Sequence, residues 1–369
     1  MKISERVSSA PMSGIRKMFD LAGPDSVNLG LGEPDLAPPK EAIEGICDAV
    51  RKGLNRYGPT AGIPELREAV AQRHGVSQNN IMITQSGTSA IFLTASSFLD
   101  PGDEALIPDP GFVVYGPHSA MAGAKVTGYG LTDELVPDAD DILRKVTRKT
   151  KVIFVNSPSN PTGGVIDKKA FKAICDIASD NDLTVISDEV YEHFVYEGDH
   201  LSFAKELDKA VVINGFSKMM AVTGWRMGYL IASENIIGEL IKMNYHTSAC
   251  PNMPAQYGIL NAMPSVDAYL DSARGVFRKR RDLIVKRLEN MDRVTIPKPK
   301  GAFYAFPKVR VPLSSEELSM ELARNGLICT PGSAFGERGE GHLRFSYAAD
   351  ETKINRGMDI LEDVTGRMV

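Results

Sequence analysis

The stretch NGFSKMMAVTGWRMGYL, residues 214–230, places Lys218 and Arg226 eight positions apart among small and apolar side chains. The segments Val211 to Ile213 and Tyr229 to Ala232, on either side, have the composition of buried strands. A lone lysine is usually a solvated surface residue. Two cations next to buried strands, however, need an anion to face them. A lysine in such a place can act as a nucleophile toward a carbonyl group.

A candidate anion site lies in the sequence TQSGTSA, where Ser86, Gly87 and Thr88 separate a strand-like stretch from a helix-like one. The free amides and the positive dipole end of a helix N-terminus bind phosphate. Serine and threonine are also ordinary helix caps, so plain capping is an alternative interpretation.

Two more polar clusters follow apolar runs. Asn160 lies in NSPSNPTGG, after the strand-like residues 151–155, and an ordinary turn would explain this composition as well as a binding role. Asp188 ends the apolar run VIS, with Tyr191 three residues later. A carboxylate at the end of a buried strand must be paired, and a helix cap, a salt bridge or a functional partner would serve.

The elements that would position these residues alternate along the chain from about residue 80. Strand-like stretches lie at 81–86, 104–108, 125–130, 151–158, 183–190 and 210–218, and helix-like stretches at 88–99, 115–122, 138–147 and 167–181. Short, nearly all-apolar strands between amphipathic helices predict an α/β fold with a mostly parallel sheet covered on both faces. Ligands bind at the carboxyl ends of such strands, where the polar clusters fall.

The C-terminal part has a different pattern. Residues 254–292 predict a long helix, and its basic run RKRRD (278–282) is expected to be a solvated face. The segments GAFYAFP, LICTPG and LRFSYA predict strands of a smaller α+β lobe closed by a helix over 350–364. We expect the first 40 residues to pack with this lobe.

Composition argues against several functions. The net charge is 42 − 47 = −5, with acids and bases interspersed, which disfavours nucleic-acid binding. Four dispersed cysteines without a CxxC pair predict reduced cysteines, mostly in the core, in a cytoplasmic protein without membrane spans. The glycines in LGLGEPD do not complete a dinucleotide motif, and GxxxxGK[ST] is absent. The six histidines show no metal-ligand spacing, so no metal site is predicted.

A pyridoxal 5′-phosphate site requires phosphate donors, a buried carboxylate, a phenol, an amide and a lysine, all of which these segments supply. The lysine would form a Schiff base with the cofactor aldehyde, and the carboxylate would keep the ring nitrogen protonated. The anion facing Arg226 is then expected to be the cofactor phosphate.

These motifs resemble the pyridoxal-phosphate-dependent aminotransferases of fold type I, and most closely the class I aspartate aminotransferase group. GFSKMMAVTGWRMG matches that family's lysine motif throughout, and RYGPTAGIPELREAV, NSPSNPTGGV, SDEVYE, GAFYAFP, PGSAFG and LRFSYA resemble family motifs in the expected order. The resemblance implies a large cofactor-binding domain with a mostly parallel seven-stranded sheet, which we place at 41–280. A smaller substrate-closing domain would comprise 1–40 and 281–369.

The resemblance also implies roles for single residues. Lys218 resembles the Schiff-base lysine and Asp188 the partner of the pyridine nitrogen, while Tyr191 and Asn160 would bind the ring hydroxyl. The remaining cofactor contacts would be a phosphate cup and two ring-stacking residues: Ser86, Gly87, Thr88, Ser217 and Arg226, then Phe112 and Val190. Arg344, with Gly32 and Asn160, would bind the substrate α-carboxylate. Tyr57 would reach the phosphate of a neighbouring subunit, which implies a homodimer with shared sites.

The expected reaction is transfer of an amino group from an L-amino acid to a 2-oxo acid, with 2-oxoglutarate as the expected acceptor. Aspartate is the first expectation for the donor, and aromatic amino acids or alanine are alternatives. Thr88 stands where some aspartate-specific relatives have a lysine for the second carboxylate. A C–S lyase or decarboxylase on the same fold, or a non-catalytic pyridoxal-phosphate-binding regulator, are the other hypotheses.

Overall fold

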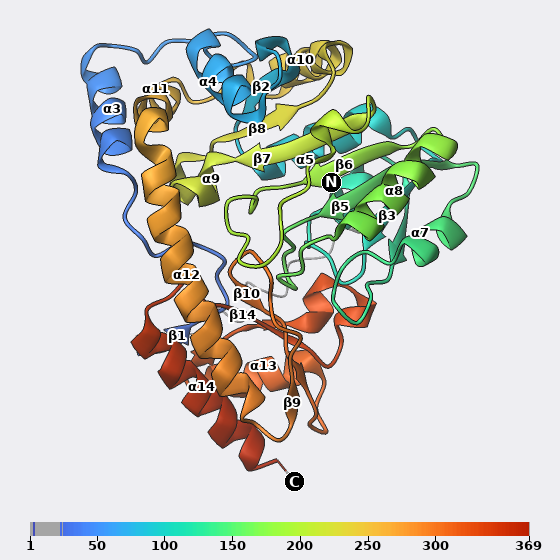
Figure 1. Ribbon diagram of the computed structural model, residues 1–369, viewed down its shortest axis with the longest axis vertical. Coiled ribbons are helices and arrows are strands. Elements are labelled where there is room, and N and C mark those ends of the chain that lie inside the picture. The colour runs from blue at the N-terminus through green and yellow to red at the C-terminus, as the bar shows by residue number, and fades with distance from the viewer. Residues whose placement is uncertain (1–2, 4–22, 24, 369) are drawn as a thin grey trace.

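The strands form one large sheet and three small ones. The structure, a computed structural model, describes residue 3, residue 23 and residues 25–368. The seven-stranded sheet forms the core of one lobe, and the two- and three-stranded sheets lie in the other (Figure 1). The part of our N-terminal expectation that concerns residues 1–2, 4–22 and 24 lies outside the described residues.

The large sheet has the strand order β2-β8-β7-β6-β5-β3-β4. Its strands are β2 (Ile81–Thr84), β3 (Glu104–Pro108), β4 (Lys125–Tyr129), β5 (Thr150–Asn156), β6 (Thr184–Asp188), β7 (Ala210–Gly215) and β8 (Gly228–Ile231). β8 is antiparallel to β2 and β7, whereas the neighbours from β7 to β4 pair in parallel. The predicted mostly parallel, seven-stranded sheet is therefore confirmed.

Helices cover both faces of this sheet, which explains why its strands are almost entirely apolar. On β5, Ile153 and Val155 belong to one buried cluster, which includes residues of α8 (Lys168–Asp180). Val152 and Phe154, which alternate with them, belong to a second cluster with α5 (Gly87–Phe98). The other helices of the lobe are α3 (Lys40–Arg51), α4 (Pro64–His74), α6 (Tyr115–Met121), α7 (Ala139–Lys145), α9 (Phe216–Met219), α10 (Glu234–Ser248) and α11 (Met253–Ala262).

The prediction of one long helix over 254–292 was wrong in its continuity. α11 ends at Ala262, a 3₁₀ turn spans Met263–Ser265, and α12 covers Val266–Glu289. Pro264 lies in this turn, and its missing amide hydrogen cannot continue an α-helical hydrogen-bond ladder. α12 then runs from the large lobe down to the small one (Figure 1).

The prediction that RKRRD is a solvated face was wrong for two of its arginines. Arg280 is 8% and Arg281 3% exposed. Arg280 binds both carboxylate oxygens of Asp35, at 2.6 and 3.0 Å. Arg281 donates to the Pro299 carbonyl at 2.6 Å and lies over the ring of Tyr196. Burial is tolerated because both guanidinium groups are paired.

The smaller lobe is built from short pairings. β10 (Tyr304–Ala305) and β13 (Thr330–Pro331) pair with opposite sides of β14 (Leu343–Ser346). β9 (Val294–Thr295) pairs with β11 (Lys308–Val309), and β1 (Val27–Asn28) pairs with β12 (Leu327–Ile328). The helices are α13 (Ser315–Arg324) and α14 (Glu351–Gly366). Residues 27–28 thus join this lobe, while the exact domain boundaries remain a prediction.

Two features of the composition can be compared with the structure. Cys329 is buried, but Cys47 is exposed and Cys175 and Cys250 are half-buried, so the expectation of mostly core cysteines was wrong. Within residues 25–368, no helix has both the length and the apolar character needed to cross a membrane.

Candidate active site

The carboxyl ends of the central strands meet at one edge of the large sheet. Asn156 at the end of β5 lies opposite Asp188 at the end of β6, and Gly228 lies between Gly215 of β7 and Thr84 of β2. A cavity of about 270 Å³ opens at this edge. Every site residue predicted from the sequence lines it, except Tyr57.

Lys218 reaches this cavity because α9 begins directly after β7, at Phe216. Its Nζ donates a hydrogen bond of 2.6 Å to the Gly32 carbonyl. Burial lowers the pKa of Lys218 to about 8, against the attraction of Glu33 and with help from the positive charge of Arg226. The amine is therefore far easier to deprotonate than that of an ordinary lysine.

Asp188 is 3% exposed at the end of β6. Burial raises its pKa to about 6, although hydrogen bonds from the Tyr115 hydroxyl and the Val190 amide act in the opposite direction. The Tyr115 hydroxyl donates to Oδ2 at 2.6 Å, and its ring stacks on Phe154. Tyr115 was not predicted as a site residue, although it lies three residues after Phe112, which was.

Arg344 is a buried cation on β14. It donates to Asn160 Oδ1 at 2.9 Å and to the Gly30 carbonyl at 2.5 Å, and its guanidinium contacts the rings of Tyr304 and Phe335. Among the described residues no carboxylate pairs with it, and its buried Nε has no hydrogen-bond partner. A buried guanidinium in this state is suited to receive a carboxylate from a ligand.

Asn156 links the two sides of the cavity and was not assigned a role from the sequence. Its Oδ1 accepts from the Asn160 amide at 2.7 Å, and its Nδ2 donates to the Asp188 carbonyl at 2.8 Å. Since Asn160 in turn binds Arg344, a continuous chain of hydrogen bonds joins β6 to β14.

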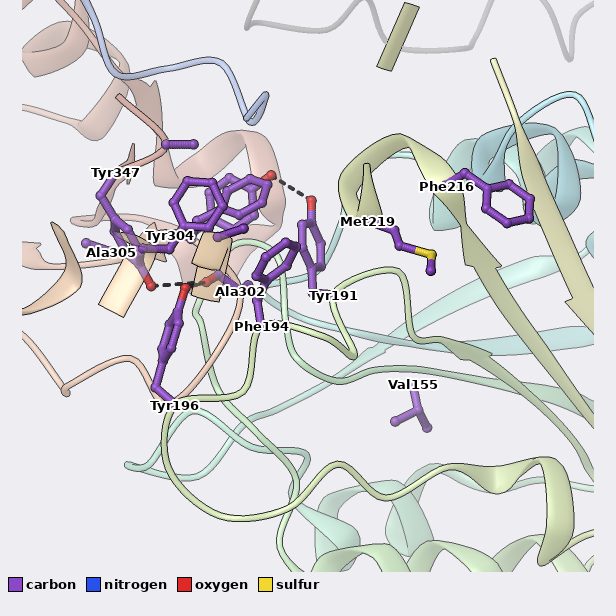
Figure 2. Close-up of a cluster of buried hydrophobic side chains, with 14 of the residues drawn as sticks. Val155, Tyr191, Phe194, Tyr196, Phe216, Met219, Ala302, Tyr304, Ala305 and Tyr347 are labelled. Atoms are coloured by element: carbon purple, nitrogen blue, oxygen red, sulfur yellow. Dashed lines mark hydrogen bonds between the residues drawn. The ribbon is translucent and has the colours of Figure 1, made fainter. Parts of the chain in front are cut away.

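Tyr191 and Tyr304 form a pair of phenols that spans the two lobes. Their hydroxyls are 2.7 Å apart and point toward each other in Figure 2. Tyr304, on β10, was also missed, although it lies in the quoted GAFYAFP segment. Tyr304 explains why residue 32 is a glycine, because a Cβ at that position would lie 2.0 Å from the Tyr304 hydroxyl oxygen.

The N-terminus of α5 forms another wall. Ser86 accepts from the Ser89 amide at 3.0 Å, whereas the amides of Gly87 and Thr88, in the first turn, have no acceptor within the helix. Arg226 borders the same cavity, and its exposed guanidinium donates to the Thr223 carbonyl at 2.8 Å. Free amides, a helix dipole and a cation make this wall suitable for a phosphate.

Tyr57 stands apart from this arrangement. It is 90% exposed and does not line the cavity of its own chain.

The family model, the similar sequences and the similar structures that match this chain all belong to one family. A family model described as "Aminotransferase class I and II" matches residues 24–361. The chain is 38% identical to a probable aspartate aminotransferase of Methanocaldococcus jannaschii, covering 98% of this chain and 99% of the relative. It is 39% identical to aromatic-amino-acid aminotransferase 2 of Thermococcus litoralis, covering 99% and 98%. The solved structure of an alanine aminotransferase from Pyrococcus furiosus superposes with a TM-score of 0.93 at 33% identity, covering 99% of this chain and 100% of that one.

Proposed function

The chain belongs to the class I and II aminotransferase family, whose members use pyridoxal phosphate, and we propose that the cavity around Lys218 holds this cofactor. The observation that carries the proposal is the placement of Lys218 between two complementary walls. One wall offers a buried carboxylate, Asp188, and the other offers the N-terminus of α5 with Arg226. These are the groups that a cofactor with a basic ring nitrogen, an aldehyde and a phosphate requires.

Bound pyridoxal phosphate supplies an aldehyde that condenses with amines and a ring that withdraws electrons from Cα. The residues of the chain bind the cofactor, orient it and move the proton. Asp188 holds the proton on the ring nitrogen, Tyr191 and Asn160 bind the ring hydroxyl, and Phe112 and Val190 cover the two ring faces. Ser86, Gly87, Thr88, Ser217 and Arg226 bind the phosphate. Nζ of Lys218 holds and moves the proton that leaves Cα of the substrate, a role worth about 10²–10⁴-fold in rate.

Arg344 fixes the substrate through the group that all amino acids share. Its guanidinium lines the cavity and has no carboxylate partner among the described residues, so it can donate to an α-carboxylate, with Asn160 and the Gly32 backbone alongside. The rings of Tyr304 and Phe335 hold the guanidinium plane in position.

For the donor we propose aspartate first, with aromatic amino acids and alanine as alternatives, and 2-oxoglutarate as the acceptor. The support is that relatives of similar identity are named for aspartate, for aromatic amino acids and for alanine. A screen of the twenty amino acids with 2-oxoglutarate would identify the donor. Donor and 2-oxoglutarate should be consumed in equal amounts; release of carbon dioxide or a thiol without consumption of 2-oxoglutarate would contradict the proposal.

Borohydride reduction tests the cofactor site directly. The purified protein should absorb visible light, and reduction should leave the cofactor covalently attached to Lys218, as peptide mass spectrometry would show. Lys242 on α10, which is exposed and pairs with Glu239, serves as the internal control. Label on Lys242 in place of Lys218 would refute the site assignment.

A further inference from the structure

A second polar cavity, of about 770 Å³, lies where α4, the segment 192–200 and the start of α12 meet. Its charged and imidazole side chains are Arg73, His74, Glu192, His193, His200 and Asp267. It shares no lining residue with the cavity around Lys218, and the proposed aminotransferase chemistry uses none of these side chains.

We propose that Glu192 and His200, which line this cavity, form with the buried Glu189 a binding site for one divalent transition-metal cation. One ligand atom from each of the three residues can be chosen so that all lie within 4.8 Å of one another. His200 Nε2 is 2.9 Å from Glu189 Oε2 and 3.7 Å from Glu192 Oε2. Ligand atoms bound to one tetrahedral Zn²⁺ at about 2.0–2.2 Å are separated by roughly 3.3–3.6 Å, so small side-chain movements are sufficient.

The orientation of Glu189 supports this role. The residue is 1% exposed, and its Oε1 accepts from the Ser187 hydroxyl at 2.7 Å and from the Phe203 amide at 3.2 Å. These two donors fix the carboxylate so that Oε2 faces His200. Outer contacts of this kind orient the ligands in metal sites.

His193 provides an independent observation. Its Nε2 is buried and has no hydrogen-bond partner, yet it lies 3.1 Å from Oε1 of Glu192. His74 Nε2 lies 3.7 Å from the same oxygen. A water from the cavity that takes the fourth position on a cation bound by Glu192 would give the unpartnered nitrogen of His193 a partner.

The donor set selects the kind of cation. Imidazole nitrogen with two carboxylate oxygens suits Zn²⁺ and its first-row neighbours, whereas Mg²⁺ and Ca²⁺ prefer oxygen ligands alone. The nearby cation Arg73 is already paired with Asp267, at 2.7 Å. The open cavity gives a hydrated ion a path to the ligands.

Zinc titration of the cofactor-loaded protein tests the proposal. After treatment with a chelator and buffer exchange, the protein would compete for Zn²⁺ with a chromophoric chelator, and its melting temperature would be recorded with and without Zn²⁺. We expect one Zn²⁺ per chain and a higher melting temperature with Zn²⁺, because a ligand that binds only the folded state stabilises it.

Three variants locate the site. Glu192→Gln and His200→Ala should each weaken Zn²⁺ binding by at least about tenfold and abolish the shift in melting temperature. His246→Ala, which removes an exposed histidine on α10, should bind Zn²⁺ like the parent. The visible absorbance of the bound cofactor reports that each variant is folded. Absence of Zn²⁺ binding in the parent, equal binding in the first two variants, or equal loss in His246→Ala would each overturn the proposal.

Discussion

Burial sets the protonation of the two groups on which the active site depends. It lowers the pKa of the Lys218 amine to about 8 and raises the pKa of the Asp188 carboxyl to about 6. Lys218 thus becomes reactive at a lower pH than a free lysine. Asp188 is still ionised at neutral pH, as a partner of a protonated ring nitrogen must be.

The reactivity of Lys218 in the cofactor-free protein should reveal its lowered pKa. The rate of acylation of Lys218, followed by peptide mass spectrometry, should rise with pH and level off above about 8. A short peptide with one lysine, which titrates near 10.5, serves as the reference. Equal pH dependence for Lys218 and for the peptide would contradict the described environment.

Replacement of Asp188 should stabilise the cofactor-free fold at neutral pH. Because burial raises the pKa of Asp188 from 3.8 to about 6, the fold favours the protonated form. The contribution of protonated Asp188 to the unfolding free energy is complete below pH 3.8 and is lost as the pH rises through 6. Asp188→Asn mimics the protonated form and can still accept from Tyr115. At pH 7 its unfolding free energy should exceed that of the parent by up to about 3 kcal/mol, from 6 − 3.8 = 2.2 units at about 1.4 kcal/mol each.

Urea titrations at pH 4 and pH 7 would measure this difference, which should nearly vanish at pH 4. With cofactor bound the order should reverse, since the neutral amide in the Asp188→Asn variant cannot pair with a protonated ring nitrogen as a carboxylate does. If the variant were less stable than the parent at pH 7 without cofactor, the prediction would be wrong. The free-energy cost of burying the Asp188 charge would then be offset by other interactions.

At the scale of elements, the site depends on how the ends of β5, β6 and β14 are tied together. Asn156 at the end of β5 binds the backbone of Asp188 and Asn160, and Asn160 binds Arg344. Asn156 therefore links the proposed cofactor residue Asp188 to the proposed substrate residue Arg344 without lining the cavity itself.

Asn156→Ala should therefore damage substrate binding as well as stability. It leaves the buried Asn160 amide without an acceptor, at about 1–3 kcal/mol, as urea titration would show, while the Asp188 carbonyl keeps the Ser157 amide as a donor. Loss of the Asn160 anchor should raise KM for the amino acid more than it lowers kcat. Asn156→Asp keeps the acceptor for the Asn160 amide and should recover much of KM, whereas a purely structural role would leave KM unchanged in both variants.

The elements of the large lobe were predictable because their strands are short, apolar and separated by amphipathic helices. The residues at their ends were predictable because a lysine, an aspartate and an asparagine are unusual beside such strands. Tyr115 and Tyr304 were missed because a tyrosine in an apolar segment has the composition of ordinary core. The burial of Arg280 was missed because its partner, Asp35, lies 245 positions away in sequence. The cluster of Glu189, Glu192 and His200 was missed because a loop, and no helical repeat, brings these side chains together.

At the scale of the whole molecule, the shared site that the family resemblance implies for Tyr57 is open to a direct test, and the residue is exposed in its own chain. If Tyr57 serves the phosphate of a neighbouring subunit, a mixture of Lys218→Ala and Tyr57→Ala chains should form heterodimers with one complete site. Activity should return toward half of normal per heterodimer after subunit exchange, with dimers confirmed by sedimentation. Adding Arg344→Ala to the Tyr57→Ala chain should keep the mixture inactive. No gain in the first mixture would mean that Tyr57 acts within its own chain or is structural.

The chain of hydrogen bonds from Asp188 through Asn156 and Asn160 to Arg344 has a further consequence. With the roles proposed above, it would fix the spacing between the contact for the cofactor ring and the contact for the α-carboxylate, two groups that do not depend on the substrate side chain. Substitutions of other residues that line the cavity, such as Leu31 or Ile91, would then change the preferred side chain while this spacing stays constant. A single ancestral scaffold could diversify in this way into enzymes that are named for different donors yet share nearly the same backbone.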